Sequence, residues 1–88
     1  MSQGYKFWNR TQLDAAVDLW ISDAPAAITT YGDINTWDVR AITDFSALFD
    51  SKTTFNSDIS NWDVSSGTDF SDMFEYAYKF NQDIGSWN

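Results

Sequence analysis

The chain has 88 residues, and its 13 Asp and Glu against 5 Lys and Arg give a formal net charge of −8. This charge repels phosphate backbones and anionic lipid, so we expect no nucleic acid partner and no binding to a membrane surface. The sequence has no run of 18 apolar residues, so we also expect no membrane insertion. The sequence contains no His and no Cys, which excludes His-based triads, thiol nucleophiles, disulfides and the usual zinc and haem sites. Residues 1–7 lack the apolar stretch of a signal peptide, so we expect a soluble chain of unassigned compartment.

The first 30 residues contain one strong helical pattern. Apolar side chains recur at helical spacing between Leu13 and Ile21, which predicts an amphipathic helix over residues 11–22. Thr11 and Asp14 resemble a capping box, and Pro25 is expected to stop the helix. We interpret residues 1–30 as an N-terminal capping segment.

An internal repeat occupies the rest of the chain. Residues 33–49 match residues 58–74 at 10 of 17 positions, always at an offset of 25, and a third copy begins at Phe80. A period of this length indicates an array of stacked units. We therefore divide residues 31–88 into a first repeat (31–55), a second repeat (56–80) and a partial third (81–88), all within one structural domain.

Each repeat shows two patterns in succession. Trp62 and Val64 alternate with polar residues, which predicts a short strand over residues 59–64. Thr68 and Asp69 then resemble the start of a helix, and an apolar stripe at helical spacing follows from Phe70 to Ala77. The fold class predicted is an α/β repeat solenoid, with leucine-rich-repeat-like short parallel strands, short helices and an N-terminal capping helix.

The motif Phe55–Ser65, followed by Thr68–Phe74 and Phe80–Ile84, resembles the BspA-like leucine-rich repeat, also called DUF285 or the mycoplasma lipoprotein repeat. The resemblance implies a surface-associated or secreted array that acts in adhesion and protein binding without a cofactor and without catalysis. Gly67 departs from the family pattern, which has an apolar residue there, as Ile42 is in the first repeat. The missing side chain either leaves a gap in the core or allows another backbone to approach.

The many acidic residues leave three alternatives to weigh. An EF-hand-like calcium loop could use five oxygen-bearing residues, although the bidentate Glu is missing and a cation beside Arg40 is unfavourable. Those residues are Asn61, Asp63, Ser65, Asp69 and Asp72. A carboxylate pair for glycoside hydrolysis is formally available, with Glu75 among the acids. The series Trp37, Trp62 and Trp87 could stack on carbohydrate. For all three we favour structural roles, namely turn and helix caps for the acids and core positions for the tryptophans.

The function predicted is non-catalytic protein binding, as a surface adhesion or docking module. The alternative is a small structural subunit of a larger assembly that uses an open C-terminal end. No capping pattern follows Trp87, so we expect one of two arrangements. Either the chain is a piece of a longer array, or that end is covered by a protein partner with a basic or neutral surface or by end-to-end self-association through the C-terminal repeat. The candidate contact residues are Arg40, Tyr76, Tyr78, Ile84 and Trp87.

Overall fold

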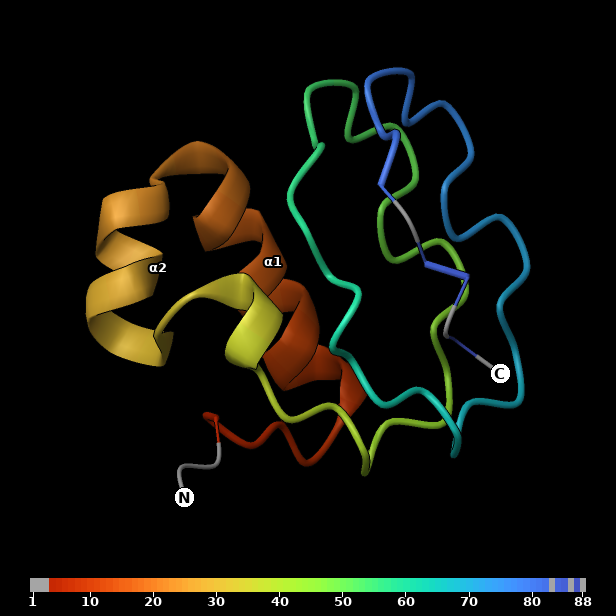
Figure 1. The fold of residues 1–88 in the computed structure, drawn as a ribbon, viewed down its shortest axis with the longest axis horizontal. Coiled ribbons are helices and arrows are strands. Elements are labelled where there is room, and N and C mark those ends of the chain that lie inside the picture. The colour runs from red at the N-terminus through yellow and green to blue at the C-terminus, as the bar shows by residue number, and fades with distance from the viewer. Residues whose placement is uncertain (1–3, 83, 86, 88) are drawn as a thin grey trace.

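The computed structural model describes residues 4–82, 84, 85 and 87. Two α-helices, α1 (Arg10–Ser22) and α2 (Ala24–Tyr31), lie together on one side, and the repeats occupy the other side (Figure 1). A 3-10 turn, η1 (Ile34–Thr36), follows α2. The helix predicted over residues 11–22 is confirmed, but its N-cap is Asn9 rather than Thr11. The Asn9 side chain accepts the N–H of Gln12 at 2.9 Å.

The helix α2 was not predicted, and Pro25 has the opposite role to the one expected. Asp23 ends α1 by donating its N–H to Leu19, and its carboxylate accepts the N–H of Ala26 to start α2. Pro25 lies in the first turn of α2, where a missing N–H costs nothing and the fixed φ suits the helix. Gly32, with φ of 80°, ends α2 in the left-handed region that glycine tolerates.

The predicted α/β solenoid with parallel strands is wrong. Within the described residues there is no strand, only two isolated parallel bridges, Lys6 with Asp38 and Asp44 with Asp69. Residues 59–62 of the predicted strand form a tight turn instead, because the Trp62 N–H donates to the Ile59 carbonyl at 3.1 Å. Such turns satisfy backbone groups locally, so the segment needs no ladder with a neighbouring strand.

The short helices predicted after each strand are also absent from the described part of the repeats. Over residues 45–52 of the first repeat, even-numbered N–H groups close turns, such as Leu48 to Phe45, while odd-numbered ones donate to the second repeat. The Phe49 N–H, which a helix would direct to residue 45, donates to Met73 at 2.8 Å. Ala47 and Ser51 have φ of 57° and 63°, which no right-handed helix permits.

The two repeats lie against one another at the offset of 25 residues. Equivalent aromatic rings stack in parallel pairs, for example Phe45 on Phe70 at 5.3 Å between ring centroids and Trp37 on Trp62 at 6.4 Å. Trp37 and Trp62 are each 3% exposed, which confirms their core assignment. The buried face of α1 joins the same hydrophobic cluster, so helix and repeats share one core. No helix among the described residues has the length and apolar character needed to cross a membrane.

Candidate functional site

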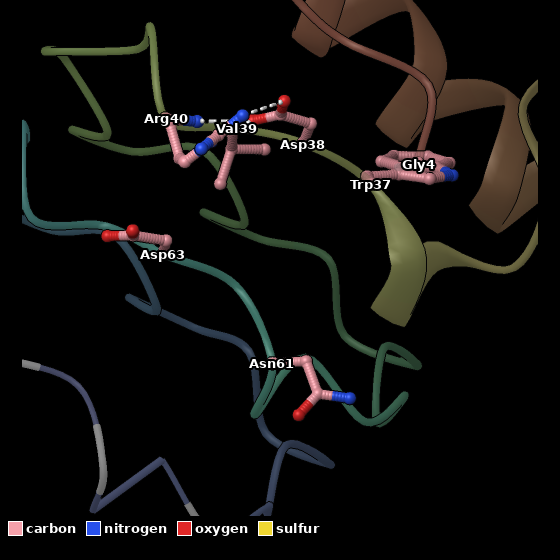
Figure 2. Close-up of a pocket in the computed structure, with 7 residues that line it drawn as sticks. All are labelled: Gly4, Trp37, Asp38, Val39, Arg40, Asn61 and Asp63. Carbon is pink, nitrogen blue, oxygen red and sulfur yellow. Dashed lines mark hydrogen bonds and ion pairs between the residues drawn. The ribbon is translucent and has the colours of Figure 1, made fainter. Parts of the chain in front are cut away.

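One hollow lies between the Asp38 region of the first repeat and the Asp63 region of the second (Figure 2). Its most prominent feature is the pair formed by Asp38 and Arg40. The guanidinium Nε and Nη2 of Arg40 donate to the two carboxylate oxygens of Asp38 at 3.1 and 3.0 Å. The Asp38 side chain is only 7% exposed, whereas that of Arg40 is 51% exposed. This bidentate contact holds the positively charged guanidinium of Arg40 at the rim of the hollow.

The chemistry of this hollow is limited. The hydrogen bonds from Arg40 hold the pKa of Asp38 below its usual range, although burial opposes them. Asp38 is therefore ionised at neutral pH and neutralises Arg40. Asp63 and Asn61 lie across the hollow from the Asp38 and Arg40 pair, as Figure 2 shows. The volume is about 190 Å³, below that of ordinary small-molecule sites.

The acidic residues of the repeats are used in turns. Asp63 accepts the N–H of Ser65 at 3.0 Å, and Asp38 accepts the N–H of Arg40 at the equivalent place in the first repeat. Asp69 accepts both the N–H and the hydroxyl of Ser71. Three such turns occur in each full repeat, which is the structural role that the sequence favoured over calcium binding. Within the described residues no group of three or more acidic side chains is placed to hold a metal ion.

A second hollow lies at the C-terminal side of the second repeat, with a volume of about 250 Å³. Its wall is almost entirely apolar. Met73 in this wall is 3% exposed, whereas Phe70 is 37% exposed because, among the described residues, the only ring that stacks on it is that of Phe45 on its inner side. The residues lining this hollow are Phe70, Met73, Phe74, Ile84 and Trp87.

The backbone beside this apolar hollow presents a row of hydrogen-bond donors. In the first repeat, the equivalent N–H groups at alternate residues donate to the second repeat at 2.7–3.0 Å. In the second repeat, no acceptor among the described residues receives the corresponding N–H groups. We call this row and the apolar hollow together the C-terminal edge. Its backbone segment, residues 70–76, runs on the side of the molecule away from α2 in Figure 1. The row consists of the N–H groups of Phe70, Asp72, Phe74 and Tyr76.

An exposed aromatic pair flanks the C-terminal edge. Tyr76 and Tyr78 are 54% and 75% exposed, and their rings meet edge to face at 6.0 Å. Glu75 lies beside them, and the negative charge of Asp72 raises its pKa, with burial and Asp50 adding to the effect. The edge therefore combines exposed aromatic surface with concentrated negative charge.

The structure separates the five candidate contact residues into groups. Ile84 and Trp87 line the apolar hollow together, and Tyr76 and Tyr78 lie on its flank. Arg40 lies apart, in the hollow of Figure 2. Sequence reasoning missed Phe70, Met73 and Phe74, because their spacing was attributed to a helix. The signal was present in the repeat itself, since Phe70 and Phe74 occupy the positions at which Phe45 and Phe49 contact the next repeat.

These features define the molecule as a repeat protein in which a helical N-terminal segment and tandem 25-residue units share one aromatic core. Residues 20–88 match the family described as Mycoplasma protein of unknown function, DUF285. The match covers most of the chain, and the chain belongs to this family, as the motifs in its sequence indicated. Neither a curated protein nor a solved structure matches the chain.

Proposed function

We propose that this chain is a non-catalytic protein-binding module that engages its partner at the C-terminal edge. The observation that carries the proposal is the coincidence of an apolar hollow with a row of backbone donors that the described residues leave without acceptors. Such a row pairs naturally with an added peptide segment, whose carbonyl groups supply affinity while pockets select its side chains. A surface adhesion role is one setting in which such binding would operate.

The aromatic content of this edge supports protein binding over small-molecule chemistry. Aromatic residues are favoured at the centres of protein interfaces, and Tyr76 and Tyr78 extend the aromatic surface beyond the hollow. The carboxylates with lowered pKa values in the repeats are ionised and held by turns, so none is poised as a general acid at neutral pH. The Trp37 and Trp62 rings are buried and stacked, which leaves their faces unavailable to carbohydrate.

The charge of the chain defines the kind of partner that would bind. A net charge of −8, with Asp72 and Glu75 at the edge itself, favours a partner with a basic or neutral surface. Association should then slow as salt is added, because screening removes the long-range attraction. The alternative role, as a structural subunit of a larger assembly, uses the same edge and differs only in the permanence of the contact.

Selection from a random peptide library displayed on phage, with the 88-residue chain immobilised, tests the proposal. The affinities of the enriched peptides are measured by calorimetry. The residues that each peptide contacts are mapped by NMR chemical shift changes on the unmodified chain. We expect the shifts to centre on residues 70–76 and on Ile84 and Trp87. The Phe70→Ala variant should weaken binding at least about tenfold, the loss expected of a central aromatic contact.

The matched control is Trp8→Ala, which removes an aromatic ring that is 66% exposed but lies on the N-terminal segment. This variant should bind the selected peptides as the unmodified chain does. Footprints on the N-terminal segment, or a library that yields no binder at all, would contradict the proposal. The shift map is read on the unmodified chain, so it decides the matter even where a variant folds poorly.

A further inference from the structure

The contact between the two repeats shows what the C-terminal edge is shaped to receive. The N–H groups of residues 45, 47, 49 and 51 donate to the carbonyls of residues 69, 71, 73 and 75, at 2.9, 3.0, 2.8 and 2.7 Å. In return, the Thr68 N–H donates to the Thr43 carbonyl at 2.7 Å. The left-handed backbone of Ala47 and Ser51 in the first repeat recurs in the second repeat at Asp72 and Tyr76, with φ of 58° and 61°. The C-terminal edge thus continues the donor face of the first repeat.

The side chains at the edge repeat the same arrangement. Phe45 and Phe49 are each covered by the equivalent ring of the second repeat, at centroid distances of 5.3 and 5.4 Å. Phe70 and Phe74 offer their outer faces in the same positions and line the apolar hollow. An incoming segment of the same pattern would complete both the ring stacks and the hydrogen bonds. A segment of a different pattern would satisfy only one of the two.

The polarity of the edge argues against a second folded copy of this chain as the occupant. The row offers donors, so its partner must offer a free row of carbonyl acceptors. In this chain the acceptor row of the second repeat is already taken by the first repeat. On the other side of the first repeat, Arg10 at the start of α1 donates to the Asp44 carbonyl at 3.2 Å, and Lys52 pairs with Asp18 of α1 at 3.4 Å. Two donor edges facing one another would leave both unpaired.

The charges at the edge select among repeat segments. In the internal contact, Asp50 of the first repeat raises the pKa of Glu75 in the second, so like charges already approach one another there. A segment identical to the second repeat would place its own acids against Asp72 and Glu75. Like charges in contact are destabilising, whereas a basic residue at either position gains a surface ion pair.

We propose that the C-terminal edge binds a 25-residue-type repeat segment of another protein chain, in the register that the second repeat takes on the first, with basic residues where this chain has Asp72 and Glu75. This inference rests on the proposed protein-binding function and specifies the partner. The segment adds carbonyl acceptors to the donor row, covers Phe70 and Phe74 with its own rings, and neutralises the acidic rim.

Amide hydrogen exchange on the 88-residue chain, read by NMR with and without a synthetic peptide, tests the proposal. The probe carries residues 56–82 of this chain with the changes Asp72→Lys and Glu75→Lys. In the free chain, the four donors of the edge should exchange fast, and those of residues 45, 47, 49 and 51 slowly. The peptide at about ten times its Kd should slow the four edge amides about tenfold, leaving the intervening amides unchanged.

Two comparison peptides sharpen the result. The peptide of unaltered sequence should bind about threefold to tenfold more weakly at low salt, and the difference should shrink at high salt. A peptide with the Lys changes but scrambled order should protect none of the four amides. Equal affinity of the altered and unaltered peptides, or protection without the alternating pattern, would overturn the proposal.

The remaining outcomes separate this inference from the proposed function. Protection of the four amides that rises with the concentration of the chain alone would mean that a second copy occupies the edge, and the inference would fail. If library peptides bind at the edge but repeat peptides do not, the binding function stands and the inference fails. If neither binds, both fail.

Discussion

The indole N–H of Trp62 donates to the carbonyl oxygen of Ile34 at 2.7 Å, in a buried contact between the two repeats. Trp87 makes the same contact with Ile59 at 3.2 Å. Trp37, which follows α2 rather than a repeat, donates to Gly32 instead. The indoles of Trp62 and Trp87 therefore tie their units to the ones before them, by a directional hydrogen bond as well as by ring stacking.

Replacing Trp62 with Phe should remove this bond while keeping an aromatic ring in the core. We expect a loss of about 1–2 kcal/mol in the free energy of unfolding, because a buried hydrogen bond is lost and a smaller ring fills the site. Urea unfolding followed by circular dichroism measures it. Trp8→Phe is the matched control, since Trp8 is 66% exposed and the change should have little effect. Equal midpoints for the two variants would contradict the role given to the indole.

Ala47→Gly distinguishes the observed turns from the predicted helix by the sign of its effect. Ala47 has φ of 57° and is exposed, so glycine relieves backbone strain, and we expect unchanged or higher stability, by up to about 1 kcal/mol. Ala15→Gly, at an exposed position inside α1, should instead lower stability by about 1 kcal/mol. Thermal melts of the two variants side by side measure both. Destabilisation of similar size in both would indicate a helix at residue 47.

The contrast between these two alanines shows where sequence reasoning succeeds and where it stops. The helix α1 was predictable because the spacing of its apolar residues and the length of the pattern both suit an amphipathic helix. The core positions of Trp37 and Trp62 followed from their recurrence in the repeat. The turns of residues 45–51 were not, because the spacing of Phe45, Leu48 and Phe49 suits a helix equally well. What decides between them is the acceptor of each N–H, and for residues 45, 47, 49 and 51 that acceptor lies in the other repeat.

The candidate site was predictable to a similar extent. Ile84 and Trp87 were named because nothing in the pattern covered them, and they do line the apolar hollow. Phe70 and Phe74 were assigned to a helix stripe, which hid their exposure to a further segment. The donor row depends on backbone direction in the turns, and no side-chain pattern encodes that directly.

The sequence suggested that Gly67 either leaves a gap in the core or allows another backbone to approach. The structure shows neither. A Cβ at Gly67 would lie 2.4 Å from Cζ of Phe70 and 2.9 Å from Cδ2 of Phe45, so the aromatic rings occupy the space. We expect Gly67→Ala to lower the free energy of unfolding by about 1–3 kcal/mol, the usual cost of overpacking. Chemical denaturation measures the change. In the background of Phe70→Leu the cost should fall, and an additive double variant would show that the Phe70 ring is not the cause.

Acid should unfold this protein through the aspartates of its repeat turns. Serine hydroxyl and N–H groups lower the pKa of four exposed carboxylates, with the hydroxyl the larger cause except at Asp58, where the N–H leads. A pKa that is lower in the folded state means that the unfolded chain binds the proton first. This contribution to stability is therefore complete above about pH 4, the ordinary range of aspartate, and is lost as the pH falls below it. The four residues are Asp44, Asp58, Asp63 and Asp69.

Changing all four to Asn tests this origin, because the amide oxygen of Asn accepts the same turn hydrogen bonds but does not titrate in this range. Melting temperatures measured from pH 7 down to about pH 2 should fall less steeply for the variant than for the unmodified chain. High salt in both series screens the repulsion within a chain of net charge −8, so that relief of repulsion on acidification does not mask the difference. Parallel curves for the two proteins would place the acid sensitivity elsewhere, with the Asp38 and Arg40 pair the next group to examine.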